Sequence, residues 1–149
     1  MSYQTTTNRL NAYRQTRVKT ASQGQMIIML YDETLKQIDL AASLLEEQSK
    51  QLDRVHNAIV IAQSCITELT VGLDFEKGGE LAENLYGLYR FFNRQLMDAN
   101  LKKEVQPLRS VRKMIFELRQ SWHKIMQQQG TMDAHTESGP SRKGINFAG

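Results

Sequence analysis

The stretch that decides the fold is GGELAENLYGLYRFFNRQLMDAN, residues 78–100. Apolar residues recur in it at steps of four, three, four and four, which places them on one face of a helix. These residues are Leu81, Leu85, Leu88, Phe92 and Leu96. A second apolar set lies beside this stripe and consists of Tyr86, Tyr89, Phe91 and Met97. Because one stripe is enough to join a bundle, the second set predicts either a helix buried on two sides or a helix that offers its second side to a partner.

Three further segments carry the same alternation of three and four residues. Together with the first stretch they predict helices at about 22–48, 52–76, 80–101 and 105–128. The added stripes are Met26, Leu30, Thr34, Ile38, Ala41 and Leu45; Val55, Ile59, Ala62, Ile66, Leu69 and Leu73; and Leu108, Val111, Ile115, Leu118, Trp122 and Ile125. Short connections between helices of similar length predict an all-α fold, an antiparallel up-down four-helix bundle.

Local signals fix the expected helix ends. Ser22 and Gln25 form a capping box at the start of the first helix. Phe75 and the pair Gly78–Gly79 are expected to end the second helix, since glycine accepts the left-handed conformation that terminates helices. Pro107 suits the first turn of the last helix, where its missing N–H would be unpaired anyway.

The two ends of the chain are expected to lie outside the bundle, which is predicted at 22–128. Residues 1–21 form a polar, basic N-terminal arm in which Leu10 and Tyr13 stand out as apolar residues three positions apart. That spacing suits one short helical turn docked on the bundle, although a disordered terminus is the alternative. The tail, 129–149, lacks periodicity and is rich in Gly, Ser and Thr, so we expect it to be disordered.

Composition limits the class of protein. The chain has 149 residues and a net charge of +3, and its basic excess lies in the arm. The N-terminus has no apolar run of the kind a secretory signal needs, and no stretch approaches a membrane span. We therefore expect a cytoplasmic protein of one domain. Cys65 is the only cysteine, which excludes a disulfide framework and favours a buried, small apolar residue.

No catalytic or cofactor-binding pattern is present, so we expect no enzyme activity, no cofactor and no metal. A di-iron bundle needs Glu-x-x-His on two helices, whereas the chain offers Asp53-x-x-His56 once. The pair Gly78–Gly79 lacks the flanking pattern of a phosphate-binding loop. The pI of about 9.1 raises the possibility of nucleic-acid binding. No recognition motif accompanies it, so we expect no nucleic-acid partner.

Several ordered blocks resemble the flagellin export chaperone family, FliS. They comprise Tyr13, Val18-x-Thr20-Ala21-Ser22, Met29-Leu30-Tyr31-Asp32, Leu73-Asp74, Gly78-Gly79, Asn84-Leu85-Tyr86-x-Leu88-Tyr89, Arg94-Gln95-Leu96, Ala99-Asn100 and Leu118-Arg119-x-x-Trp122. They span about residues 10–125. Gln23 departs from the family pattern, which commonly has proline there, but the capping box still starts the helix.

The resemblance implies a cytosolic chaperone, active without ATP, that binds the disordered C-terminal region of flagellin. Binding would prevent premature polymerisation and keep flagellin competent for type III export. We expect a 1:1 complex in which flagellin covers a groove on the second and third helices. The expected groove residues are Ile61, Cys65, Tyr86 and Tyr89. Leu10 and Tyr13 of the arm are expected to cover part of the groove when flagellin is absent.

The resemblance also leaves other partners open. By family analogy, a component of the flagellar export gate or a regulator of flagellin could bind as well. The alternative function is a helical-bundle adaptor or regulator that binds another flagellar or nucleic-acid partner through the apolar groove or the basic arm.

Overall fold

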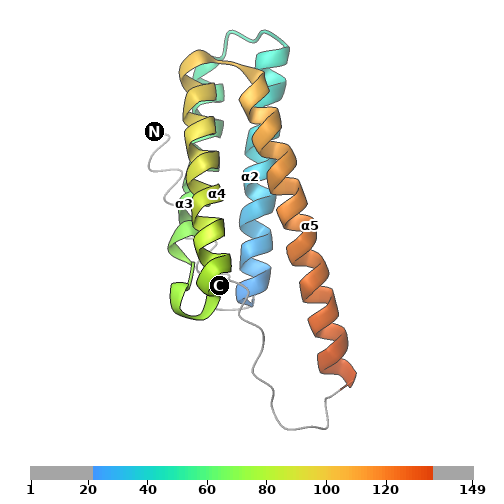
Figure 1. Cartoon of the computed structure of the whole chain (residues 1–149). Coiled ribbons are helices and arrows are strands. Elements are labelled where there is room, and N and C mark those ends of the chain that lie inside the picture. Colours follow the sequence, from blue (N-terminus) through green and yellow to red (C-terminus); the bar gives the residue numbers. More distant parts are fainter. Residues whose placement is uncertain (1–21, 136–149) are drawn as a thin grey trace.

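Four helices make up residues 22–135, the part of the chain that the computed structural model describes; its side chains are described for residues 22–128. The helices are α2 (Gln23–Glu46), α3 (Leu52–Val71), α4 (Phe75–Lys102) and α5 (Val105–His135). They run alternately up and down (Figure 1). α2 and α4 each pack on both α3 and α5, which closes the four into a ring. The predicted helical bundle is confirmed.

The core lies along the axis of this ring and receives one stripe from each helix. Its largest fully buried side chains include Tyr31 from α2, Ile59 from α3, Phe92 from α4 and Ile115 from α5. Each comes from a predicted stripe or, for Tyr31, from the position beside one. Burying such a side chain contributes about 1.5–3 kcal/mol, so the stripes are the main stabilising element of the fold.

The capping box at the start of α2 is confirmed. The Ser22 Oγ accepts a hydrogen bond from the Gln25 backbone N–H, and the Gln25 Oε1 accepts one from the Ser22 N–H. At the other end of α2, the Ser49 N–H donates to the Leu44 carbonyl while Gln48 adopts φ 55°. These bonds pair backbone groups that a helix end otherwise leaves open.

The turn between α3 and α4 differs from the prediction. α3 ends at Val71 and not near 76, and a new helical turn begins at Phe75. Asp74 caps this turn, because its Oδ1 accepts hydrogen bonds from the N–H groups of Glu76 and Lys77. Gly79 then bends α4 with φ 50° and ψ −123°, a conformation that glycine adopts without steric cost.

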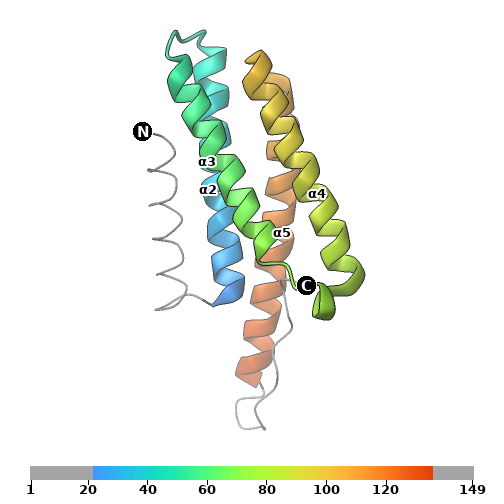
Figure 2. The same ribbon diagram turned by 90° about the vertical axis from the view of Figure 1, so that its left-hand side faces the viewer.

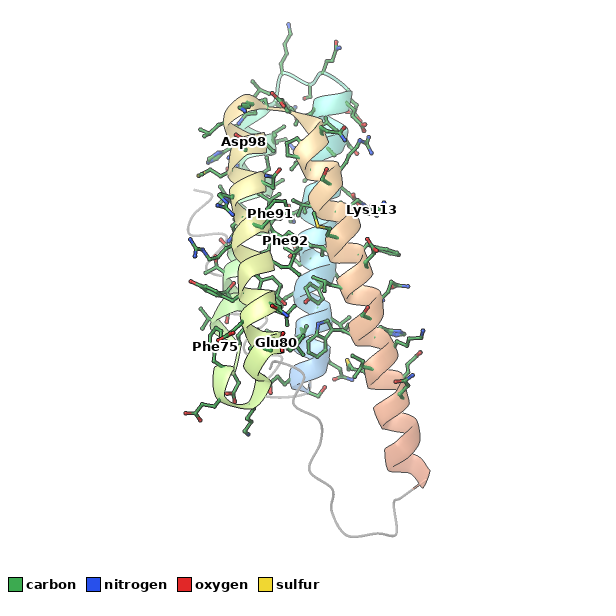
Figure 3. All side chains as sticks on the ribbon, in the orientation of Figure 1. Phe75, Glu80, Phe91, Phe92, Asp98 and Lys113 are labelled. Carbon is green, nitrogen blue, oxygen red and sulfur yellow. The ribbon has the colours of Figure 1, made fainter. Side chains whose placement is uncertain are left out.

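The buried face of α4 is also rotated from the predicted stripe. Its buried residues are Ala82, Leu85, Tyr89, Phe92, Leu96 and Ala99. Leu81, placed in the stripe from the sequence, is 53% exposed, whereas Tyr89 is 2% exposed. Downstream of the bend the buried residues recur at steps of three, four, three, four and three from Ala82 to Ala99. Leu81 lies one position before this series and therefore falls outside the core face. Figure 3 shows Phe91 and Phe92 on the side of α4 that looks toward α5.

The last helix continues to His135, past the predicted end at 128, and runs beyond the lower end of the bundle (Figure 1). Three ion pairs join it to α2: Asp32–Arg119, Asp39–Arg112 and Glu46–Arg109. Hydrogen bonding to the carboxylate of Asp39 raises the pKa of Arg112 above its usual value.

Two predicted segments lie outside the described residues. They are the arm at 1–21, with Leu10 and Tyr13, and the part of the predicted tail after 135.

Candidate protein-binding surface

The residues predicted to form the groove do not share one surface. Ile61 and Cys65 of α3 are 8% and 0% exposed, and Tyr89 of α4 is 2% exposed. Tyr86, three residues before Tyr89 on α4, is 40% exposed. Of the four, only Tyr86 is substantially accessible to a partner in this conformation.

Tyr89 belongs to a buried polar network. Its hydroxyl lies 2.6 Å from the hydroxyl of Tyr31, which is fully buried in α2. The Tyr31 hydroxyl also hydrogen-bonds Trp122 of α5. Since an indole can only donate, Tyr31 accepts from Trp122 and has its own proton available for Tyr89. Burial raises the pKa of Tyr89 to about 12 and that of Tyr31 well above its ordinary value. The network joins three helices through their hydroxyl and indole groups.

Large apolar side chains remain exposed along the outer side of α3 and α4. We call this surface the α3–α4 face and define it by Val71, Phe75, Tyr86 and Met97, which are 75%, 49%, 40% and 51% exposed. Figure 2 shows α3 and α4 side by side, and Figure 3 places Phe75 near their turn. The Phe75 and Tyr86 rings meet edge to face, with centroids 5.9 Å apart. Monomers seldom expose apolar groups together without use.

A shallow, open depression lined mainly by polar residues lies between α3 and α4. This polar hollow has an open volume of about 430 Å³ and is lined by Gln63, Thr67, Arg90, Asn93, Arg94 and Met97. The Asn93 Nδ2 donates to the Thr67 Oγ1 at 3.4 Å, and the Gln63 Nε2 donates to the Asn93 carbonyl at 3.3 Å. These bonds tie α3 to α4 across the hollow.

One atom in the hollow lacks a hydrogen-bond partner among the described residues. The Asn93 Oδ1 is buried and accepts no hydrogen bond from them. The Thr67 hydroxyl cannot supply one, because its proton goes to the Gln63 carbonyl at 3.0 Å. Leaving a buried acceptor unpaired costs about 1–3 kcal/mol. This oxygen is therefore available to accept a hydrogen bond from a group that enters the hollow.

The charge on this face is unbalanced. Arg90 lies over the Tyr86 ring, 5.7 Å from its centroid. Neither Arg90 nor Arg94 belongs to an ion pair between described residues, whereas the arginines of α5 pair with carboxylates of α2. The α3–α4 face therefore combines exposed apolar groups with two positive charges that form no ion pair with a described residue. This pattern fits a segment that is both apolar and acidic.

The described part of the chain contains a small cavity, no group of metal-ligating side chains and no helix that could span a membrane. A small cavity between the ends of α2, α3 and α4 and Trp122 has a volume of about 30 Å³, enough for about one water molecule. Residues 22–128 contain no group of three or more His, Cys, Asp or Glu side chains placed to hold a metal ion. Within residues 22–135, no helix is apolar enough over sufficient length to cross a bilayer.

Sequence reasoning missed most residues of the α3–α4 face. Val71, Arg90 and Arg94 were not expected there, and Met97 was known only as a member of the second apolar set. A usable signal exists: Gln63, Thr67 and Val71 recur every four residues, and Tyr86, Arg90, Asn93 and Met97 recur at steps of four, three and four. These are helical faces of mixed polarity, displaced from the core stripes.

Comparisons with known proteins identify relatives of this chain. A family model described as flagellar protein FliS matches residues 6–129. The flagellar secretion chaperone FliS of Bacillus subtilis is 31% identical over 132 residues, which cover 89% of this chain and 96% of the relative. The protein of the same name from Salmonella typhimurium is 32% identical over 126 residues, or 80% of this chain and 91% of the relative. The Escherichia coli protein is 32% identical over 107 residues, 70% and 76% of the two chains.

Proposed function

Because the chain belongs to the FliS family of flagellar secretion chaperones, we propose that it is a cytosolic chaperone for flagellin. It binds the disordered C-terminal region of flagellin, which prevents premature polymerisation and keeps the client competent for type III export. The action is binding alone, with no chemical step and no cofactor.

The observation that carries the proposal is the exposed apolar surface of α3 and α4. A disordered client loses conformational entropy when it becomes ordered, so its contact must bury a long apolar surface. Phe75, Tyr86 and Met97 on α4, with Val71 at the end of α3, offer exposed apolar side chains for such a contact. An amphipathic client helix lying along it would use the helix-in-groove mode of recognition.

Within the predicted groove we assign different roles to exposed and buried residues. Tyr86 contacts the client directly, because its ring is accessible. Ile61, Cys65 and Tyr89 support the face from the core, since their side chains are buried. On this assignment, changes at Tyr86 affect binding, and changes at Tyr89 affect stability.

We also propose that the N-terminal arm competes with the client. Leu10 and Tyr13 would cover part of the apolar surface in the absence of flagellin, and the apparent affinity would fall by the fraction of time that the arm is docked. Replacing both with alanine should then tighten flagellin binding and increase arm mobility in NMR relaxation. Unchanged affinity together with unchanged mobility would eliminate this role.

The experiment that tests the function is titration with the C-terminal segment of flagellin from the same organism. Calorimetry at two temperatures and two salt concentrations should give 1:1 binding of micromolar affinity or tighter, with a negative heat-capacity change that marks apolar burial. Tyr86→Ala should weaken it about tenfold or more.

Phe116→Ala on α5 is the matched control. Phe116 is 43% exposed and lies under Arg112 at 5.7 Å, the same exposure and cation–π geometry that Tyr86 has with Arg90. This variant should bind as the wild type does. If both variants lose the same affinity for the flagellin segment, the α3–α4 face is not the specific binding surface for the client. No binding by the wild type would favour an adaptor for another partner.

A further inference from the structure

Two arginines on the α3–α4 face stand beside a buried oxygen that lacks a donor. Arg90 precedes Asn93 by three positions on α4, and Arg94 follows it directly. All three line the polar hollow. An apolar client alone would leave both guanidinium charges against an apolar surface, which costs free energy unless a counter-charge arrives with the client.

We propose that the polar hollow binds a carboxylate of the client, an Asp or Glu side chain, with Arg90 and Arg94 as its partners. The inference rests on the proposed function, since it requires the client helix to lie on the α3–α4 face. It adds a chemical requirement: the bound segment carries an acidic residue flanked by apolar residues at helical spacing.

Arg90 links the charged and the apolar parts of the contact. Without client its guanidinium lies over the Tyr86 ring, where the attraction is that of an exposed cation–π pair. A carboxylate offers charge-assisted, bidentate hydrogen bonds, which are stronger. It therefore draws Arg90 from Tyr86 into the hollow, and the ring becomes available for the client's apolar side chains.

The same movement accounts for Asn93. A guanidinium has five N–H donors, and a bidentate carboxylate uses two of them. Once Arg90 turns toward the hollow, a remaining N–H can donate to the Asn93 Oδ1 one helical turn away. Client binding then completes the hydrogen bonding of an oxygen that is buried and unpaired in the client-free protein.

The test uses the full chain and the flagellin C-terminal segment at about 50 mM and about 500 mM salt. The double variant Arg90→Gln with Arg94→Gln should bind about tenfold more weakly at low salt, and only about twofold more weakly at high salt. The control is Lys113→Gln with Lys124→Gln, which removes the same charge from exposed positions on α5 (Figure 3 labels Lys113). The control should change affinity less than twofold.

A double-mutant cycle identifies the carboxylate. Each Asp and Glu of the segment is changed to its amide; the partner of the hollow is the one whose loss weakens binding to the wild type but not to the double variant. The inference is overturned if the arginine double variant binds within twofold of the wild type. It is also overturned if this variant loses no more affinity than the lysine control does. If Tyr86→Ala weakens binding in that case, the chaperone function stands without the carboxylate. If the wild type itself does not bind, the proposed function has failed.

Discussion

The hydroxyl network of Tyr31, Tyr89 and Trp122 leads to a prediction with an internal asymmetry. In Tyr89→Phe, the Tyr31 hydroxyl keeps its donor Trp122 but loses its acceptor. One hydrogen bond is lost and one buried donor is left unpaired, which costs about 1–3 kcal/mol. In Tyr31→Phe, both Trp122 and Tyr89 lose their partner, so the cost should be clearly larger.

The double change to phenylalanine should cost less than the sum of the single changes. It removes both hydroxyls together, so neither is left buried without the other, and the two substitutions are therefore coupled. For a chain of this length, a loss of about 2 kcal/mol lowers the melting temperature by about 4–8 °C.

Denaturant unfolding followed by circular dichroism at 222 nm gives these free energies. Tyr86→Phe serves as the control, because Tyr86 is 40% exposed and its hydroxyl makes no hydrogen bond to a described residue; it should change stability by less than about 0.5 kcal/mol. Equal costs for Tyr31→Phe and Tyr89→Phe, or strict additivity in the double variant, would refute the assigned direction of the network.

Three further predictions concern stability. The free energy of unfolding should fall as pH rises above about 10. In the unfolded chain tyrosines ionise near 10.0, whereas Tyr31 and Tyr89 stay protonated in the folded protein. Each of the two therefore lowers the free energy of unfolding by up to about 1.4 kcal/mol per pH unit. Alkaline unfolding monitored with phenolate absorbance should show a shallower pH dependence in Tyr31→Phe, and an unchanged slope would contradict the shift. Gly79→Ala should destabilise the fold by about 1–2 kcal/mol, because Gly79 has a positive φ. Gly87 has equally open space but lies in regular helix, so Gly87→Ala should stabilise the fold by about 0.5–1 kcal/mol. Thermal melts in which both substitutions shift the stability in the same direction would be inconsistent with the bend. Arg119→Gln should cost about 0.2–1 kcal/mol at low salt and less at high salt, because its pair with Asp32 is partly exposed; a salt-independent loss would point to packing instead.

Periodicity was sufficient to predict the fold, because each helix buries one stripe and the stripes repeat at helical spacing. It was not sufficient for Tyr89. A tyrosine beside the stripe suits either a core or a surface, and the choice depended on a hydroxyl partner 58 residues away in the sequence. No local pattern reports such a contact.

The helix ends show a second limit. The pair Gly78–Gly79 led to a predicted helix start near 80. In the structure Asp74 caps a helical turn that begins at Phe75, and Gly79 bends this helix instead of preceding it. The polar hollow was harder still to foresee, because it arises where Gln63 and Thr67 of one helix meet Asn93 of the next.

The ion-paired seam between α2 and α5 has a consequence for biosynthesis. The first helix of the bundle meets the last, so the ring cannot close until the ribosome has released α5. Until then, Tyr31 and its neighbours on α2 face an open side, and the growing chain presents the kind of apolar surface that proteases and general folding factors bind. A product truncated before Arg109 would lack every partner of Asp32, Asp39 and Glu46 in that seam. We therefore expect chains that lack α5 to be cleaved by proteases more readily than chains that contain it.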